Sequence, residues 1–276
     1  MQYIDVGNEN STTIKLHYED HGSGDPVVLI HGWPLNGASW EKQELALLNS
    51  GYRVITYDRR GFGDSSQPVT GYDYDTFAAD LNKLIKALEL EDVTLVGFSM
   101  GTGEVTRYIG NYGTDNVKKA GLLGSIPPYL LKTSDNPDGV DKEGFNQIMA
   151  AIKNDRLAFL TQFLTDFYNM DILEGKLISK EVFQNSWNVA STASPTGTYE
   201  CVKTWLTDFR KDVESIDIPT LILHGDADRI LPVDKTARRL KDLVKNNTYV
   251  EIENGPHGLI WTHAEQVNKA LLDFLD

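Results

Sequence analysis

A serine flanked by glycines, between an apolar run and a helical pattern, is the feature that most constrains this chain. The apolar run Val93–Val96 breaks at Gly97, Ser99 follows, and helical spacing begins after Gly101. Such a tight strand-to-helix turn requires small neighbours, and it pushes the serine hydroxyl out above the sheet. The next amide lies at a helix N-terminus, where an unpaired N–H can receive an oxyanion. A plain strand-to-helix loop is the alternative, but the flanking strand and helix favour Ser99 as a nucleophile.

Short apolar runs alternate with helical patterns on both sides of this serine. An amphipathic strand with period two is expected at 14–18, and buried strands are expected at 27–30, 53–57, 93–96, 120–126, 219–223 and 248–252. Alternation of strands and helices predicts an α/β protein, with a mostly parallel sheet covered by helices on both faces.

The alternation stops at Pro127 and returns near Ile216. Between these points the spacing is helical, with candidate helices around 142–153, 155–168, 179–192 and 197–208. Helices inserted between two strands of such a sheet lie over its carboxyl edge. We therefore expect a core formed by residues 1–126 and 216–276, and a helical cap formed by residues 127–215. A few of the cap's many aromatic side chains should face Ser99.

Local signals place several helix ends. Ser39 is expected to cap a helix that Gly51 stops. Pro232 suits the first turn of a helix that runs to about residue 244. Thr262 and Glu265 have the spacing of a capping box that opens the final helix.

Charge and composition limit the partners of the chain. Its 276 residues carry a net charge of -14, which argues against nucleic acid and anionic membranes, because both require clustered Lys and Arg. The single cysteine, Cys201, excludes an intramolecular disulfide and is expected to be a structural thiol in a reducing cytosol. The N-terminus lacks the pattern of an export signal, and no apolar run approaches the ~20 residues that cross a bilayer. We predict a cytoplasmic protein.

The chain offers six histidines as the base that a serine nucleophile needs. Only His257 lies in a loop after the last strand, at the sheet edge where Ser99 emerges. His31 and His224 each end a buried strand before a glycine, where an imidazole usually bonds to backbone. His257 is therefore the predicted general base.

Two aspartates in the loop after the preceding strand compete to orient that base. Asp228 stands farther from the strand and can reach His257, whereas Asp226 is expected to form a turn by bonding its own backbone. The resulting order Ser99, Asp228, His257 is that of the α/β-hydrolase arrangement and differs from chymotrypsin and subtilisin.

The second oxyanion donor is expected in the loop after the strand at 27–30. Trp33 N–H is the candidate, paired with Met100 N–H. Pro34 has no N–H to donate, and a Trp–Pro bond is among the few that can be cis. The later glycine-rich loop lacks the Walker spacing of a phosphate loop, so Arg59 and Arg60 are expected to tie it down by bonding carboxylates and carbonyls.

Taken together, these motifs resemble those of the cofactor-free bacterial haloperoxidases. These are bromoperoxidases and chloroperoxidases of the α/β-hydrolase fold, closely related to aryl esterases. The resemblance spans nearly the whole chain, and it implies a mostly parallel eight-stranded sheet with helices on both faces and an inserted helical cap. The segments that carry it are His31–Pro34, Asp58–Gly63, Gly97–Val105, Asp135–Gly139, Asp166–Asn169 and Gly255–Leu259.

The resemblance also implies an activity: a serine esterase for short or aryl carboxylic esters with a perhydrolase side reaction. Hydrogen peroxide then replaces water in deacylation, and the released peracid oxidises halide in solution. The halide needs no binding site, and no haem, vanadium or other metal is implied. Relatives often form dimers or trimers, so a homo-oligomer is possible here.

The resemblance assigns substrate-contacting positions as well. Pro34 matches the position whose carbonyl is thought to favour peroxide as the nucleophile. Phe159, Phe163 and Ile230 fall where relatives line the acyl pocket, and Trp205 is close to another such position. Met100 agrees with some members of the family, whereas others carry Thr there, which leaves the acyl preference open.

Other functions fit part of the pattern. Dehalogenases and epoxide hydrolases of this fold use an aspartate nucleophile, and Ser99 speaks against both. A lactone or an amide as native substrate stays open, because the same triad serves lactonases and amidases. A ligand-binding receptor that keeps a hydrolase pocket is the alternative from a different class, and steady turnover of p-nitrophenyl acetate separates it from an esterase.

Overall fold

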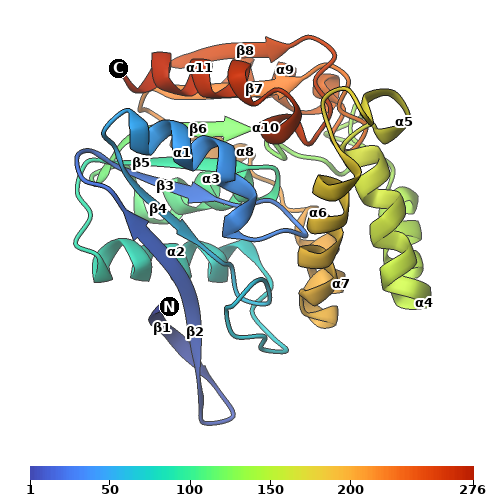
Figure 1. Ribbon diagram of the computed structural model, residues 1–276, viewed down its shortest axis with the longest axis horizontal. Coiled ribbons are helices and arrows are strands. Elements are labelled where there is room, and N and C mark those ends of the chain that lie inside the picture. Colours follow the sequence, from blue (N-terminus) through green and yellow to red (C-terminus); the bar gives the residue numbers. More distant parts are fainter.

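An eight-stranded sheet forms the centre of the computed structural model, which describes all 276 residues (Figure 1). The strand order is β1-β2-β4-β3-β5-β6-β7-β8. The two pairings of β2, with β1 and β4, are antiparallel, and all pairings from β4 through β8 are parallel. The strands are β1 (Gln2–Glu9), β2 (Thr12–His21), β3 (Pro26–Ile30), β4 (Arg53–Tyr57), β5 (Val93–Phe98), β6 (Val117–Leu123), β7 (Thr220–Gly225) and β8 (Asn247–Ile252).

The sequence patterns of the strands match their places in the sheet. Every residue of β5 and β7 is buried, which agrees with their unbroken apolar runs and with helices covering both faces. Ile14 and Leu16 of β2 are buried on either side of the exposed Lys15, as the period-two pattern indicated, but the alternation fails at His17, which is also buried. The expected mostly parallel sheet is confirmed, and β1 is a strand that the sequence analysis did not identify.

Helices cover the two faces of the sheet. Helices α1 (Glu41–Asn49) and α11 (Ala264–Leu275) pack together on one face, and α2 (Tyr74–Ala87) and α3 (Met100–Tyr112) pack together on the other (Figure 1). The apolar side of α2 is buried, and the Asp73 carboxylate caps it by accepting from Thr76 N–H. None of the helices combines the length and apolar character needed to cross a bilayer.

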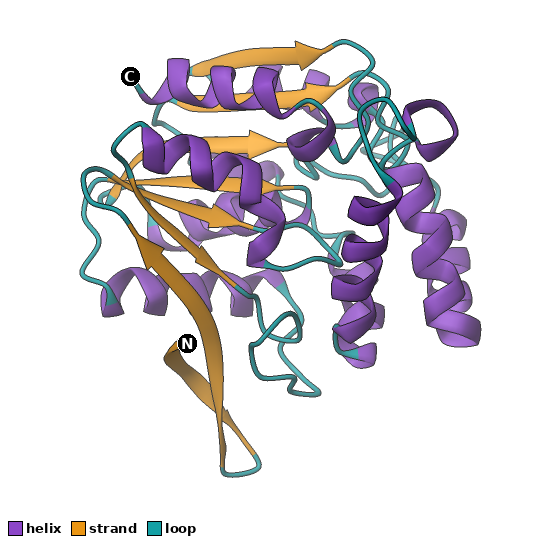
Figure 2. Ribbon diagram, viewed as in Figure 1, coloured by secondary structure: helices purple, strands orange, loops and turns teal.

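A group of helices lies between β6 and β7. Figure 2 shows most of them gathered beyond the arrowheads of the parallel strands, at the carboxyl edge of the sheet. Asp155 interrupts the first of them with non-helical backbone angles, where the sequence analysis expected one helix to end and another to begin. The division into core and cap at residues 126/127 and 215/216 stays a prediction. The helices are α4 (Lys142–Phe167), α5 (Met170–Leu173), α6 (Lys180–Thr192), α7 (Pro195–Thr204) and α8 (Arg210–Glu214).

Two expected helix caps are wrong. Ser39 lies inside a 3-10 helix (Gly37–Trp40), where its hydroxyl donates to Asn36 O, and α1 starts only at Glu41 without a side-chain cap. Thr262 is the last residue of a separate short helix, α10 (Leu259–Thr262), so it cannot open α11. In both places an extra helical turn occupies the position that the capping residue was expected to hold.

The helix expected from Pro232 to residue 244 is also interrupted. A 3-10 turn (Val233–Lys235) comes first, and α9 (Ala237–Leu243) follows it. The break is at Thr236, whose φ of -130° and ψ of -95° are not helical. By contrast, α1 ends at Asn49 just before Gly51, which has a φ of +87° that favours glycine.

Candidate active site

Ser99 occupies a strained turn between β5 and α3. Its φ of 54° and ψ of -118° lie where non-glycine residues are rarely found. Glycine is required on both sides, because a Cβ at Gly97 would lie 2.4 Å from Gly101 O and a Cβ at Gly101 would lie 2.2 Å from Ile30 O. The close packing of these backbones holds the serine in this conformation, and it is the sharp turn that the sequence pattern predicted.

Three side chains from three loops meet at this turn. His257 Nε2 lies 2.8 Å from Ser99 Oγ, and His257 Nδ1 lies 2.6 Å from Asp228 Oδ2. Ser99 follows β5, Asp228 follows β7 and His257 follows β8, so the carboxyl ends of parallel strands bring them together. All three residues are buried, with exposed fractions of 6%, 6% and 0%.

The Asp228 carboxylate is held in place by several donors. Its Oδ1 accepts from Ile230 N–H at 2.8 Å and from Leu231 N–H at 2.7 Å. Burial alone would raise the pKa of Asp228, but the charge and hydrogen bond of His257 and the hydrogen bond of His224 outweigh it and hold the pKa well below its ordinary value. The carboxylate is therefore ionised at neutral pH and can orient the imidazole.

Asp226, the other candidate for the acid, bonds to a neighbouring loop and not to His257. Its Oδ1 accepts from Asn254 N–H at 2.6 Å, so it joins the loop after β7 to the loop after β8. The expectation that it would bond its own backbone is wrong for this contact, because the neighbouring loop supplies the donor. Its place is outside the Ser99–His257–Asp228 chain of contacts.

The loop after β3 lies against the serine. A Cβ at Gly32 would be 3.0 Å from Ser99 Cβ, which shows how closely the two backbones approach. The N–H groups of Trp33 and Met100, the two predicted oxyanion donors, make no hydrogen bond to any other group of the chain. The Trp33–Pro34 bond is cis. Two free donors beside the serine are what an oxyanion hole requires, and this role of Trp33 and Met100 stays a prediction.

A buried ion pair joins the loop after β4 to α3, the helix that follows the serine, and the same arginine bonds to the loop after β3. Arg59 Nε donates to Glu104 Oε2 at 2.7 Å, and both side chains are fully buried. Arg59 Nη2 also donates to His31 O at 2.9 Å. Arg60 pairs with Asp80 in the same way. The expectation that these arginines bind carboxylates and carbonyls is confirmed.

An apolar cavity of about 260 Å³ lies under the cap. Phe159, Phe163, Trp205 and Ile230, four of the five predicted substrate contacts, line it, whereas Pro34 does not. Trp33 and the three residues Ser99, Asp228 and His257 are not among the lining residues. The Trp33 ring packs on two side chains that are, with its centroid 4.8 Å from that of Phe163 and 4.9 Å from that of Trp205.

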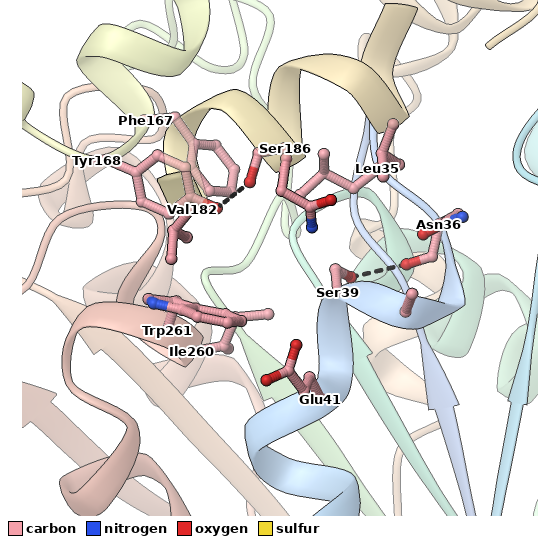
Figure 3. Close-up of a pocket in the computed structure, with 13 residues that line it drawn as sticks. Leu35, Asn36, Ser39, Glu41, Phe167, Tyr168, Val182, Ser186, Ile260 and Trp261 are labelled. Atoms are coloured by element: carbon pink, nitrogen blue, oxygen red, sulfur yellow. Dashed lines mark hydrogen bonds between the residues drawn. The ribbon is translucent and has the colours of Figure 1, made fainter. Parts of the chain in front are cut away.

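A second aromatic contact joins this region to the base. The Phe167 ring lies 5.9 Å from Phe163 and 5.1 Å from His257, measured between centroids. Phe167 also lines a separate cleft near Ser39 and Trp261, shown in Figure 3, where Tyr168 OH and Ser186 Oγ share a hydrogen bond of 2.8 Å. That cleft has a volume of only about 40 Å³, which holds a water molecule or two and not an acyl group.

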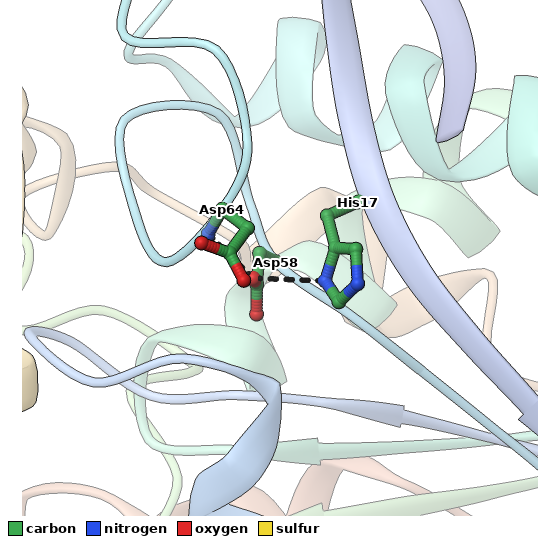
Figure 4. A group of neighbouring side chains, drawn as sticks. All are labelled: His17, Asp58 and Asp64. Carbon is green, nitrogen blue, oxygen red and sulfur yellow. Dashed lines mark hydrogen bonds and ion pairs between the residues drawn. The ribbon is translucent and has the colours of Figure 1, made fainter. Parts of the chain in front are cut away.

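Two clusters contain atoms that could bind a metal, and one of them, Glu19, His21 and Glu44, is largely exposed. His17, Asp58 and Asp64 place ligand atoms within 4.8 Å of one another (Figure 4). However, the Asp58 carboxylate already accepts from Gly37 N–H and Asp64 N–H, and Oδ2 contacts His17 Nδ1 at 3.2 Å. These bonds tie the loop after β4 to the segment after Pro34, so the cluster has a structural explanation that needs no ion.

The comparison with known protein families identifies the chain. A family model described as alpha/beta hydrolase fold matches residues 25–264. The chain is an α/β hydrolase. The sharp strand-to-helix turn at Ser99 and the strand order agree with membership of this family, and the expected fold class is confirmed.

Individual relatives narrow the position of this α/β hydrolase within its family. It is 62% identical over the full length of both chains to a Synechocystis sp. protein that is named provisionally as a non-heme chloroperoxidase. It is 35% identical to the bifunctional esterase/perhydrolase DCH of Acinetobacter calcoaceticus, with 95% of this chain and 96% of that protein covered. Bromoperoxidase from Bacillus anthracis has a similar crystal structure, with 49% identity, 99% coverage of both chains and a TM-score of 0.95. The expected relationship to the haloperoxidases is confirmed.

One contact at the site of this hydrolase was not foreseen. His224, in β7, was expected to bond only to backbone, yet its Nε2 also lies 3.1 Å from Asp228 Oδ2. The spacing of four residues between them was the available signal. Outside a helix, a spacing of four residues does not predict a contact, because a strand followed by a loop can place two such residues at many distances.

Proposed function

We propose that this α/β hydrolase is a serine esterase for short or aryl carboxylic esters that also forms peracids from hydrogen peroxide. The chain of contacts from Ser99 Oγ through the His257 imidazole to Asp228 carries the proposal. A hydroxyl, a base and an orienting carboxylate in hydrogen-bond reach form the arrangement that activates a serine for acyl transfer.

The acylation step follows from these contacts. Ser99 Oγ attacks the ester carbonyl carbon while its proton passes to His257 Nε2. The tetrahedral oxyanion accepts hydrogen bonds from Trp33 N–H and Met100 N–H. Collapse of this intermediate breaks the bond to the alcohol, which leaves with the proton from His257, and the acyl group stays on Ser99.

Deacylation reverses these steps with a second nucleophile. Water attacks the acyl carbon, gives its proton to His257 and releases the carboxylic acid. Hydrogen peroxide in the same place releases the peracid instead. In solution the peracid transfers one oxygen to bromide or chloride, which yields carboxylate and hypohalous acid. The halide needs no site on the protein, and these steps call for no metal or organic cofactor.

The size and lining of the cavity support short or aryl acyl groups. About 260 Å³ bounded by Phe159, Phe163 and Trp205 suits a small apolar or aromatic group more than a long chain. We infer that these three side chains and Ile230 bind the acyl part. Pro34 lies outside the lining of this cavity, and we keep for it the role of favouring peroxide near Ser99.

Hydrolysis of p-nitrophenyl acetate tests the esterase. The wild-type protein should turn over steadily with a burst of p-nitrophenol when deacylation is slow, and Ser99→Ala should abolish turnover at unchanged Tm. A ligand-binding receptor would show only a trace that Ser99→Ala leaves unchanged, and that result would reject the proposal.

Bromination of monochlorodimedone tests the perhydrolase. With peroxide and bromide present, the rate should depend on added acetate or another short acid and should vanish in Ser99→Ala. Bromination that proceeds equally well without any carboxylate or ester would contradict peracid as the oxidant.

The setting of the enzyme completes the proposal. We infer that the enzyme acts in the cytoplasm, where reducing conditions suit its single buried thiol, Cys201. A homo-oligomer is one possible assembly, and light scattering at micromolar concentration tests it. The partners proposed for the site are the ester or carboxylate and hydrogen peroxide.

A further inference from the structure

His224 is a second buried histidine beside the proposed catalytic acid. It lies one residue before the end of β7, it is fully buried, and its Nε2 is 3.1 Å from Asp228 Oδ2. The same Oδ2 lies 2.6 Å from His257 Nδ1. One carboxylate oxygen therefore contacts two imidazoles, and the acyl-transfer steps above use only one of them.

The hydrogen-bond partners of His224 determine which nitrogen holds its proton. Ser125 N–H, a backbone donor, points at Nδ1 at 3.2 Å, so Nδ1 must offer its lone pair. The proton is then on Nε2. There it hydrogen-bonds to Leu231 O at 2.8 Å, and Asp228 Oδ2 lies 3.1 Å from the same nitrogen. The backbone N–H of Ser125, after β6, thus puts the proton of His224 on Nε2, the nitrogen that contacts the carboxylate.

We propose that His224 is a positioning residue that donates its Nε2–H to Asp228 and so fixes the carboxylate that orients His257. The inference rests on the proposed function of the triad. His224 touches neither substrate nor Ser99, and it acts through Asp228 alone. With this bond the carboxylate has a donor on each side of Oδ2, so that oxygen cannot rotate away from His257 Nδ1.

No other charged side chain competes for this role. Asp228 Oδ1 is occupied by the N–H groups of Ile230 and Leu231. Arg229, the nearest cation in sequence, turns away to form a bidentate pair with Asp171. The rings packed on His257 are those of Phe98 and Phe167, which carry no charge. His224 and His257 are therefore the only side-chain donors to Asp228.

Loss of this donor should change the pH dependence of the reaction. With one donor fewer, the negative charge of Asp228 is less compensated, so the carboxylate attracts a proton on His257 more strongly. The acidic limb of the pH profile of kcat/KM should move upward by about 0.5 to 1 pH unit, which is part of the effect of one hydrogen bond to a charged group.

Two substitutions of His224 separate donation from mere filling of space. His224→Gln places an amide N–H about as far from the backbone as Nε2, so it can still donate to Asp228. His224→Asn reaches only as far as Nδ1, so it can serve Ser125 but not Asp228. We expect His224→Asn to shift the acidic limb upward and to lower kcat about tenfold, and His224→Gln to keep the wild-type limb. An unshifted limb in His224→Asn, or an equal shift in both variants, would overturn the proposal.

A measurement on the wild-type protein removes any dependence on folding of the variants. In ¹⁵N-histidine-labelled protein, His224 should show a protonated Nε2 and an unprotonated Nδ1 between pH 6 and 8. A proton on Nδ1 would refute the inference even if the enzyme hydrolyses esters. Conversely, this tautomer is a property of the folded chain, and it would be found even if Ser99→Ala left turnover unchanged and the proposed function failed.

Discussion

A methyl group at residue 32 tests the oxyanion loop with a very small perturbation. In Gly32→Ala the new Cβ would lie 2.9 Å from Phe98 Cδ1 and 3.0 Å from Ser99 Cβ, whereas ordinary contacts begin at 3.4 Å. The backbone of Gly32 does not have a positive φ, so alanine fits its conformation. The substitution therefore creates steric overlap but no backbone strain, and either the new Cβ or a group that it touches must move by about half an ångström.

The surroundings indicate which group moves. The Phe98 ring is buried between Trp40, Phe167 and His257, with centroid distances of 5.1 to 6.2 Å, so it cannot turn away. Ser99 is held by the glycines of its own turn. The loop that holds Trp33 N–H must then retreat. Loss of one oxyanion donor costs about 3 kcal/mol of transition-state stabilisation, and a shift of half an ångström should forfeit a large part of that.

We therefore expect kcat for p-nitrophenyl acetate to fall by about 10- to 100-fold in Gly32→Ala, with a smaller change in KM. Gly7→Ala is the matched control, because its Cβ would meet nothing closer than 4.0 Å and it lies in β1, away from the site. A Gly32→Ala enzyme that is folded, as judged by Tm, and keeps kcat within twofold of wild type would refute the placement of the oxyanion donor in this loop.

Three further outcomes follow from the site. Asp228→Asn should lower kcat by about 10³- to 10⁴-fold in the same assay. Since the folded pKa of Asp228 is depressed, its stabilising effect exists above its unfolded pKa of about 3.9 and fades as pH falls, so the variant should lose more Tm at neutral pH than below about pH 3. Burial raises the pKa of Cys201 to about 12, so Ellman's reagent should label it only after denaturation in guanidinium. Phe159→Ala should raise kcat/KM for p-nitrophenyl hexanoate relative to the acetate by about tenfold, because it enlarges the cavity proposed to bind the acyl group.

The parts of the site that the sequence predicts are those that topology fixes. Ser99, Asp228 and His257 could be chosen because each follows a strand of the parallel sheet, and all carboxyl ends of such strands meet at one edge. These three residues are far apart along the chain, but the parallel sheet brings the loops that carry them close together in space. The same reasoning placed the loop of Trp33 beside Ser99.

The parts that sequence reasoning missed depend on contacts rather than on topology. β1 has only two buried apolar side chains, Ile4 and Val6, and its turn into β2 uses Asn10 and Ser11 with positive φ instead of the usual Asn-Gly pair. Its pattern therefore looks like a polar terminus. The wrong cap at Thr262 has a similar origin, because α10 and α11 are separated by the unusual backbone of one residue, which no local pattern announces.

Two histidines at corresponding strand ends show how neighbours set chemistry that residue type leaves open. His31 follows the last residue of β3 and accepts from Arg59 N–H at Nε2, so its proton lies on Nδ1 and donates to Gly32 O. Burial and the charge of Arg59 hold the pKa of His31 well below its ordinary value, which keeps this form neutral. At the end of β7, His224 accepts at Nδ1 and donates from Nε2, the opposite tautomer. In each case one backbone N–H from an adjacent segment donates to one ring nitrogen, so the proton lies on the other ring nitrogen. That proton is donated to a different loop in the two cases. His31 bonds to the loop of Trp33, the proposed oxyanion donor, and His224 contacts Asp228, the proposed acid. The His-Gly sequence is the same in both, so only the register of the neighbouring segment distinguishes the two roles.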